Sequence, residues 1–347
     1  MTEETTRYQV ERTPARYAVM LNARAKGWSG SLHHAVQRFV SPKDLFLTDD
    51  FRQAQRTVDR ILAARYDAVF AGGGDGTLMY LINAFEERAR QGLIAREELP
   101  TIGVLRLGTG NALASYLGAD HVLRDLRALR SGAPLTVHTV HMVEGGGHEG
   151  VFPFAGFGWD ADILNDYDLV KEMVRDTSLE GTIAGPLGYG AAIVTRSIPR
   201  AVVKPPLRVR ITNLGERAMQ INYEGEILRE FGADEVVFEG DVKICGASSV
   251  PFWGFNVRMF PRATARPGFF QLRAFHGPLG EVVFHLRDLW RGRFPEASMF
   301  DMHASHVRVE ILGEPTPYQV SGDVAGMERE IEWKIAPHPA KLAVPLH

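Results

Sequence analysis

Two glycine-rich segments contain the residues of this sequence that are best suited to chemistry. Gly72–Thr77 (GGGDGT) follows one short apolar run, and Gly108–Asn111 (GTGN) follows the next. Each segment precedes a stretch with helical spacing of apolar residues, so each is predicted to connect a strand to a helix. Glycine lets the backbone approach an anion closely, and the first N–H groups of a helix point at one spot. The pattern therefore predicts two phosphate-binding loops.

Common nucleotide motifs do not fit these loops. A Walker A loop requires Lys, but only seven of the 39 Lys and Arg residues are Lys, and none lies between Lys43 and Lys171. A dinucleotide fingerprint requires a third glycine where Thr77 and Leu113 stand. What remains is a glycine loop with Asp75 at its centre. A carboxylate beside phosphates holds Mg²⁺ or accepts a proton from an attacking hydroxyl, as in phosphoryl transfer.

Alternating strands and helices are predicted to position both loops. The expected strands are Tyr17–Leu21, Leu45–Leu47, Tyr66–Ala71 and Thr101–Leu107. The expected helices are Ser31–Val40, Phe51–Arg65, Thr77–Arg90, Ala112–Leu117 and His121–Leu129. This alternation favours an α/β domain with a parallel sheet, in which both loops lie at one edge.

After residue 134 the pattern changes to strands separated by turn residues. These strands are Leu135–Val143, Phe152–Phe157, Leu207–Thr212, Glu235–Cys245, Phe269–Phe275, His306–Ile311 and Tyr318–Val320. Helical spacing interrupts them at Ala161–Arg175, Pro186–Thr195 and Leu279–Trp290. We therefore expect a β-rich, largely antiparallel sandwich as the C-terminal domain.

Composition excludes several classes of protein. The 347 residues carry a net charge of −3, which gives no support for binding to nucleic acid. A single cysteine, Cys245, leaves no intramolecular disulfide and is expected in the core. We find no secretory signal and no uncharged apolar run of about 18 residues. A cytoplasmic location is expected, and peripheral contact with a membrane stays open.

The motifs resemble those of one enzyme family. In chain order they are Leu21–Arg24, Thr48, Gly73–Thr77, Gly108–Asn111 and Gly156–Ala161, with thinner similarity at Phe260–Ala263 and Pro267–Phe269. Together they resemble the catalytic domain of diacylglycerol kinases, sphingosine kinases and related bacterial lipid kinases. The resemblance implies an ATP- and Mg²⁺-dependent kinase that phosphorylates a hydroxyl of a diacylglycerol, a sphingoid or a related lipid. It also implies a nucleotide site in the cleft between an α/β domain and a β-rich domain.

The resemblance assigns roles and boundaries. The nucleotide-binding residues would be Asn22, Arg24, Thr48, Gly73, Gly74, Gly76, Thr77, Gly108, Thr109, Gly110 and Asn111. Asp75 and Asp323 would be the catalytic and metal-binding acids, and Asp160 and Asp162 would face the substrate. The domains would be a polar segment at 1–16, the kinase domain at 17–134 and the lipid-substrate domain at 135–330, with 331–347 packing back on the kinase domain. The partner would be a lipid at a membrane surface; a homodimer is left open.

Several residues depart from the family pattern. Ser321-Gly322-Asp323 stands where the family has Asp-Gly-Glu, and Tyr80 stands where sphingosine kinases often have Glu. Arg106 replaces a proline before the second loop, and with Arg24 and Lys26 it is a candidate to bind phosphate. Two alternatives stay open. One is an NAD kinase-like enzyme, and the other is a nucleotide- or lipid-binding member of the family without phosphotransfer.

Overall fold

The computed structural model describes residues 8–108, 111–159, 161, 205–253, 257–278, 281, 285, 288, 291–294 and 296–347. The predicted helices Ala161–Arg175, Pro186–Thr195 and Leu279–Trp290 lie wholly or mostly outside these residues. The chain divides into two compact units, described separately below. The first unit extends to Met142 and also includes Phe252, Trp253 and the chain from Pro337 onward. The second unit comprises Val143–Pro251 and Val257–Ala336.

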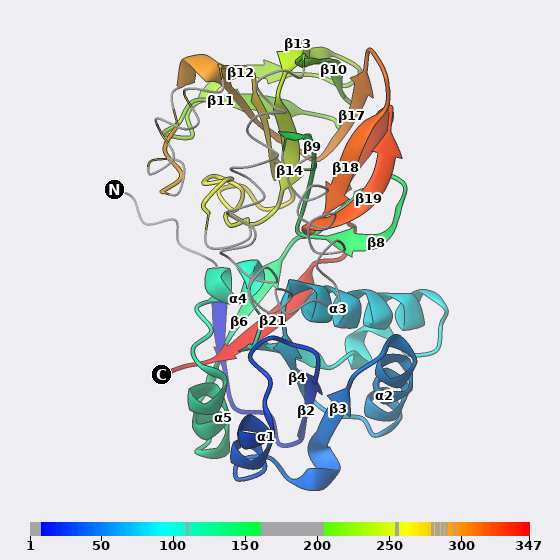
Figure 1. The fold of residues 1–347 in the computed structure, drawn as a ribbon, viewed down its shortest axis with the longest axis vertical. Helices are drawn as coiled ribbons and strands as arrows, with labels where there is room; N and C mark the ends of the chain where they lie inside the picture. Colours follow the sequence, from blue (N-terminus) through cyan, green and yellow to red (C-terminus); the bar gives the residue numbers. More distant parts are fainter. Residues whose placement is uncertain are drawn as a thin grey trace, which may run out of the picture. The chain divides into compact units, whose positions relative to one another are not determined.

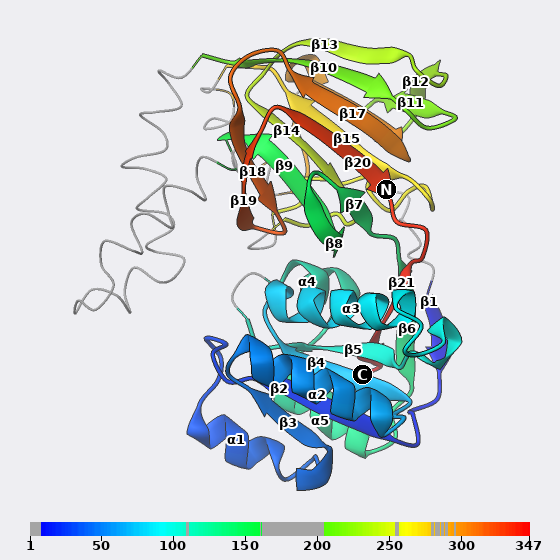
Figure 2. The same ribbon diagram turned by 90° about the vertical axis from the view of Figure 1, so that its right-hand side faces the viewer.

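The first unit contains a seven-stranded sheet (Figures 1 and 2). Its strands, in spatial order, are β1 (Tyr8–Glu11), β6 (Leu135–Val140), β21 (Ala340–Pro345), β5 (Thr101–Arg106), β4 (Ala68–Gly73), β2 (Tyr17–Asn22) and β3 (Leu45–Thr48). The strands from β21 to β3 are parallel, whereas β6 and β1 are antiparallel to their neighbours. The unit therefore ends after Met142 rather than at residue 134, because β6 pairs within this sheet. β1 likewise draws part of the polar segment at 1–16 into the sheet.

In the described part of the first unit, five α-helices pack around this sheet. They are α1 (Gly30–Val36), α2 (Phe51–Ala63), α3 (Asp75–Arg90), α4 (Ala112–Leu117) and α5 (Val122–Arg130), with 3₁₀ turns at Pro42–Asp44 and Arg96–Glu98. Figure 2 shows α1 and α5 on one side of the sheet and α3 and α4 on the other. Val36 of α1 and Leu126 of α5 join Leu21 and Phe70 of the strands in one buried cluster. Helix propensity alone is weak, so this apolar contact with the sheet is what fixes the helices.

The second unit is a sandwich of two antiparallel sheets. The six-stranded sheet contains β13 (Val236–Val242), β10 (Leu207–Asn213), β17 (His306–Ile311), β20 (Glu330–Ile335), β7 (Val143–Gly145) and β8 (His148–Phe152). The eight-stranded sheet contains β12 (Ile227–Phe231), β11 (Ala218–Ile221), β16 (Met299–Ala304), β15 (Phe270–Phe275), β14 (Ile244–Ser248), β9 (Phe154–Gly158), β18 (Thr316–Val320) and β19 (Asp323–Glu328). Both sheets contribute to one core, in which the Trp333 Nε1–H donates to the Tyr318 hydroxyl at 2.9 Å. The predicted combination of an α/β domain with a β-rich sandwich is confirmed.

Two predicted strands each prove to be two strands in different sheets. Leu135–Val143 separates into β6 of the first unit and the start of β7 of the second. Glu235–Cys245 separates at Lys243 into β13 and β14, one in each sheet of the sandwich. Alternation of apolar residues continues through such a crossing, so the pattern does not reveal it. In the described part of the chain, no helix is long and apolar enough to cross a bilayer.

Candidate functional site

The two glycine loops meet at the carboxyl edge of the parallel sheet. β4 pairs with β2 on one side and with β5 on the other, and the register joins Leu21 to Gly72 and Gly73 to Arg106. The chain therefore leaves all three strands at the same edge, where ligands of open α/β sheets bind.

The first loop is closed by a contact between Gly73 and the first turn of α3. A Cβ atom on Gly73 would lie only 2.3 Å from the Thr77 hydroxyl oxygen, so a side chain there has no room. Asn22, at the end of β2, donates from Nδ2 to the same hydroxyl at 3.0 Å. Its Oδ1 accepts the Arg24 N–H at 2.9 Å. Asn22 thus ties the loop after β2 to the first loop.

The second loop packs directly on the first. A Cβ atom on Gly108 would lie 2.2 Å from the Cα of Gly74, so only glycine permits this approach. The Leu107 N–H donates to the Gly73 carbonyl at 3.2 Å. Asn111 has a φ of +51° and folds back, because its Oδ1 accepts the Gly108 N–H at 3.2 Å and its Nδ2 donates to the Gly108 carbonyl. The loops are therefore held together before any ligand binds.

Asp75 joins the two loops through its side chain. It begins α3, and its Oδ2 accepts the Ala112 N–H at 2.8 Å while its Oδ1 accepts the Leu113 N–H at 3.1 Å. The carboxylate thereby caps the start of α4, whose first N–H groups have no partner within the helix. Burial raises the pKa of Asp75 and outweighs these two hydrogen bonds, which lower it. No sequence signal foretold this cap, since the partners lie far along the chain.

The comparisons with known proteins agree with this geometry. The family model for the diacylglycerol kinase catalytic domain matches residues 16–142. Met142 is also the last residue of the N-terminal segment of the first unit. Residues 16–142 are therefore similar to the diacylglycerol kinase catalytic domain. Diacylglycerol kinase 2 of Arabidopsis thaliana is 25% identical over 175 residues, which are 44% of this chain. The match spans only 24% of that relative's length.

The fold of the whole chain is similar to that of solved structures. The crystal structure of a diacylglycerol kinase from Bacillus anthracis superposes with a TM-score of 0.60 at 15% identity, covering 96% of this chain and 97% of the other. A second crystal structure from that organism gives a TM-score of 0.61 at 16% identity, covering 95% and 97%. At these identities the likeness concerns the fold alone.

Several polar side chains predicted to bind nucleotide make internal hydrogen bonds within the first unit. Thr48 is buried, and its hydroxyl donates to the Leu21 carbonyl at 3.4 Å. Asn22, Thr77 and Asn111 make the internal hydrogen bonds given above. The groups that remain exposed at this edge include Arg24, Gly76 and Arg106. Thr109 and Gly110 lie outside the described residues.

The other acids predicted to act at the site, Asp160, Asp162 and Asp323, belong to the second unit. Asp323 is exposed at the start of β19, after a two-residue turn in which Ser321 and Gly322 have φ of +55° and +87°. Asp160 and Asp162 lie outside the described residues. Among the residues that are described, no three His, Cys, Asp or Glu side chains gather into a metal-binding group.

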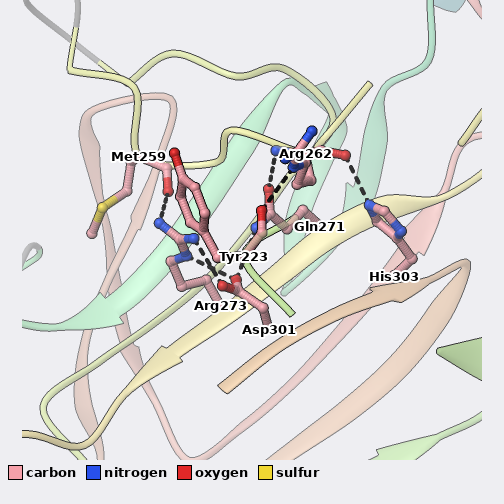
Figure 3. Close-up of polar contacts among 7 residues, drawn as sticks. All are labelled: Tyr223, Met259, Arg262, Gln271, Arg273, Asp301 and His303. Atoms are coloured by element: carbon pink, nitrogen blue, oxygen red, sulfur yellow. Dashed lines mark hydrogen bonds and ion pairs between the residues drawn. The ribbon is translucent and has the colours of Figure 1, made fainter. Parts of the chain in front are cut away.

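A buried polar layer on β15 and β16 is a feature that the sequence reasoning missed (Figure 3). Arg273 and Asp301 form an ion pair through two hydrogen bonds of 2.8 Å, and Arg273 also donates to the Met259 carbonyl at 2.7 Å. Gln271 Oε1 accepts the Arg262 N–H at 2.8 Å, and His303 Nε2 lies 2.8 Å from the Arg262 carbonyl. Polar residues at every second position of both strands were the available signal. The layer fixes the backbone of the segment 259–262 against the sheet.

Proposed function

We propose that the protein is an ATP-dependent lipid kinase that phosphorylates a hydroxyl of a diacylglycerol, a sphingoid or a related lipid. The observation that carries this proposal is the pair of interlocked glycine loops at the carboxyl edge of the parallel sheet, with Asp75 between them. The family model that matches residues 16–142 and the name of the Arabidopsis thaliana relative, diacylglycerol kinase 2, support transfer of a phosphoryl group to a lipid hydroxyl.

The glycine loops would bind the phosphates of the nucleotide. Gly76 is exposed, and a Cβ there would meet nothing within 4 Å, so phosphate oxygens can approach its backbone closely. Arg24, Lys26 and Arg106 are exposed at the loop edges and would supply positive charge. Arginine suits this task because its guanidinium binds phosphate in a two-point manner.

Asp75 is the proposed proton acceptor for the attacking hydroxyl or a ligand of Mg²⁺. A carboxylate offers about four lone-pair sites, and the two N–H groups of α4 take one on each oxygen. The remaining sites fit a proton or a cation. When bound, Mg²⁺ would neutralise phosphate charge, with Asp75 and Asp323 as its proposed carboxylate ligands. A raised pKa keeps Asp75 closer to the range in which a general base works.

The acceptor would be a lipid at a membrane surface, reached peripherally from the cytoplasm. Asp160 and Asp162 remain the predicted residues that face it. Ser321 stands on the turn where the family has an acid, which favours a second candidate function, namely nucleotide binding without phosphotransfer.

The test is incubation of the protein with labelled ATP, Mg²⁺, a mixed lipid extract and NAD. A labelled lipid supports the proposal, and labelled NADP would assign NAD kinase activity instead. Retained ATP binding without a labelled product would favour the non-catalytic reading. Asp75→Ala should lower turnover by about 10²–10⁴-fold, the usual contribution of a general base; wild-type turnover in that variant would refute the role of Asp75.

A further inference from the structure

A pocket opens in the first unit beside the second glycine loop. Its volume is about 650 Å³, and all of its lining residues belong to the first unit. Its walls come from the loop after β2, the first turn of α1, the end of β5 with Gly108, and the segment from α4 to the start of α5. Apart from Gly108 and Arg106, none of these lining residues is among the candidates from the sequence.

The charge of the pocket is set by Arg106. This last residue of β5 is exposed and forms no ion pair with any residue that the structure describes. Asp120 also lines the pocket, but its carboxylate accepts the His121 N–H and pairs with Arg124. The hydrogen bond from the His121 N–H is the main reason that the pKa of Asp120 is lowered. Arg106 is thus the charge in the pocket that has no described counterpart, which favours an anionic ligand.

A second observation points to the same ligand. Ser115, on α4, lines the pocket, and its hydroxyl oxygen is buried without a hydrogen-bond partner among the described residues. A buried polar group left unpaired costs about 1–3 kcal/mol. A phosphate oxygen in the pocket would accept a hydrogen bond from this hydroxyl and so remove the cost of the unpaired group.

Apart from His121, the remaining side chains that line the pocket are apolar. Leu107, Ala119 and Val122 are largely buried and present hydrocarbon to the pocket, together with Leu32. A pocket of this size with one cation and several apolar walls suits an anion attached to an organic group better than a bare ion.

We propose that this pocket binds a phosphate ester, with Arg106 as its cation and Ser115 as a hydroxyl donor. The ester could belong to the nucleotide or to a phosphorylated lipid headgroup, since both present the same chemistry. The site deepens the proposed kinase function, but its evidence is the geometry of the first unit. Arg106 also stands where the resemblance predicts proline, so the site is a feature of this chain.

The test is isothermal titration of the full chain with ADP and, separately, with glycerol 3-phosphate, in buffer with EDTA. Arg106→Ala should weaken binding of the probe that occupies the pocket by about tenfold, as expected for loss of a charge-assisted hydrogen bond. Ser115→Ala should weaken the same probe without lowering thermal stability, because the lost hydroxyl has no described partner. Arg130→Ala is the matched control, since Arg130 is exposed on α5 and does not line the pocket.

The outcomes separate the two sources of the ester. An effect of Arg106→Ala on ADP alone assigns the pocket to the nucleotide, and an effect on glycerol 3-phosphate alone assigns it to the lipid headgroup. Equal affinities for both probes in Arg106→Ala and Arg130→Ala, or no binding to the wild-type chain, would overturn the proposal. Because titration requires no turnover, a chain that binds an ester but transfers no phosphate would contradict only the proposed kinase function.

Discussion

Replacing Asp75 with alanine removes a carboxylate that links the two glycine loops. The Ala112 and Leu113 N–H groups at the start of α4 donate to this carboxylate at 2.8 and 3.1 Å. Both lose their hydrogen-bond partner in the variant. Hydrogen bonds to a charged group contribute ~1.5–3 kcal/mol each, but burial of the carboxylate, which raises its pKa, offsets part of this gain. We expect the local opening free energy to fall by ~2 kcal/mol, the upper end for loss of a helix cap.

Amide hydrogen exchange measures this effect at the two bonds themselves. A loss of ~2 kcal/mol corresponds to about 30-fold faster exchange at Ala112 and Leu113. Asp50→Ala is the matched control, because Asp50 is exposed and caps α2 by accepting the Gln53 N–H at 2.7 Å. That variant should accelerate exchange at Gln53 and leave α4 unchanged. Unaltered exchange at Ala112 and Leu113 in Asp75→Ala would refute the capping role.

Three further predictions follow from burial and packing. Gly108→Ala should destabilise the first unit by ~1–3 kcal/mol, because the added Cβ would meet the Gly74 backbone. Gly30→Ala is the control, since a Cβ there meets nothing within 4 Å. Equal melting temperatures for the two variants would contradict the contact between the loops. Asp301→Ala should cost ~3–5 kcal/mol in chemical denaturation, since Arg273 would stay buried and unpaired; a loss below ~1 kcal/mol would show that the pair is solvated. Burial lowers the pKa of His303 from 6.5, so the unfolded chain binds its proton more readily and stability falls as pH drops below about 6.5. His303→Gln should make that fall shallower between pH 7 and 5.5, and an identical slope would count against it.

Local sequence information predicted much of the first unit. The alternation of short apolar runs with helical spacing gave α4 with its observed bounds and most other helices and strands to within a few residues. Glycines and turn residues located both loops, because only glycine tolerates the close approach that Gly73 and Gly108 make. These features depend on sterics and hydrophobic period along a single segment, which a sequence contains directly.

Contacts between distant segments were decided by the tertiary structure. β21 enters the first sheet between β5 and β6, and Asp75 finds its partners on α4, because strand register brings these segments together. The same register turned the polar side chains predicted to bind nucleotide, Asn22, Thr48, Thr77 and Asn111, toward one another and the backbone. The sequence by itself determined which loops would form and that an acid lies in one of them. Only the packing of β4, β5 and the helices that follow them decided that this acid caps a helix, since hydrogen bonds between loops depend on positions that no local pattern records.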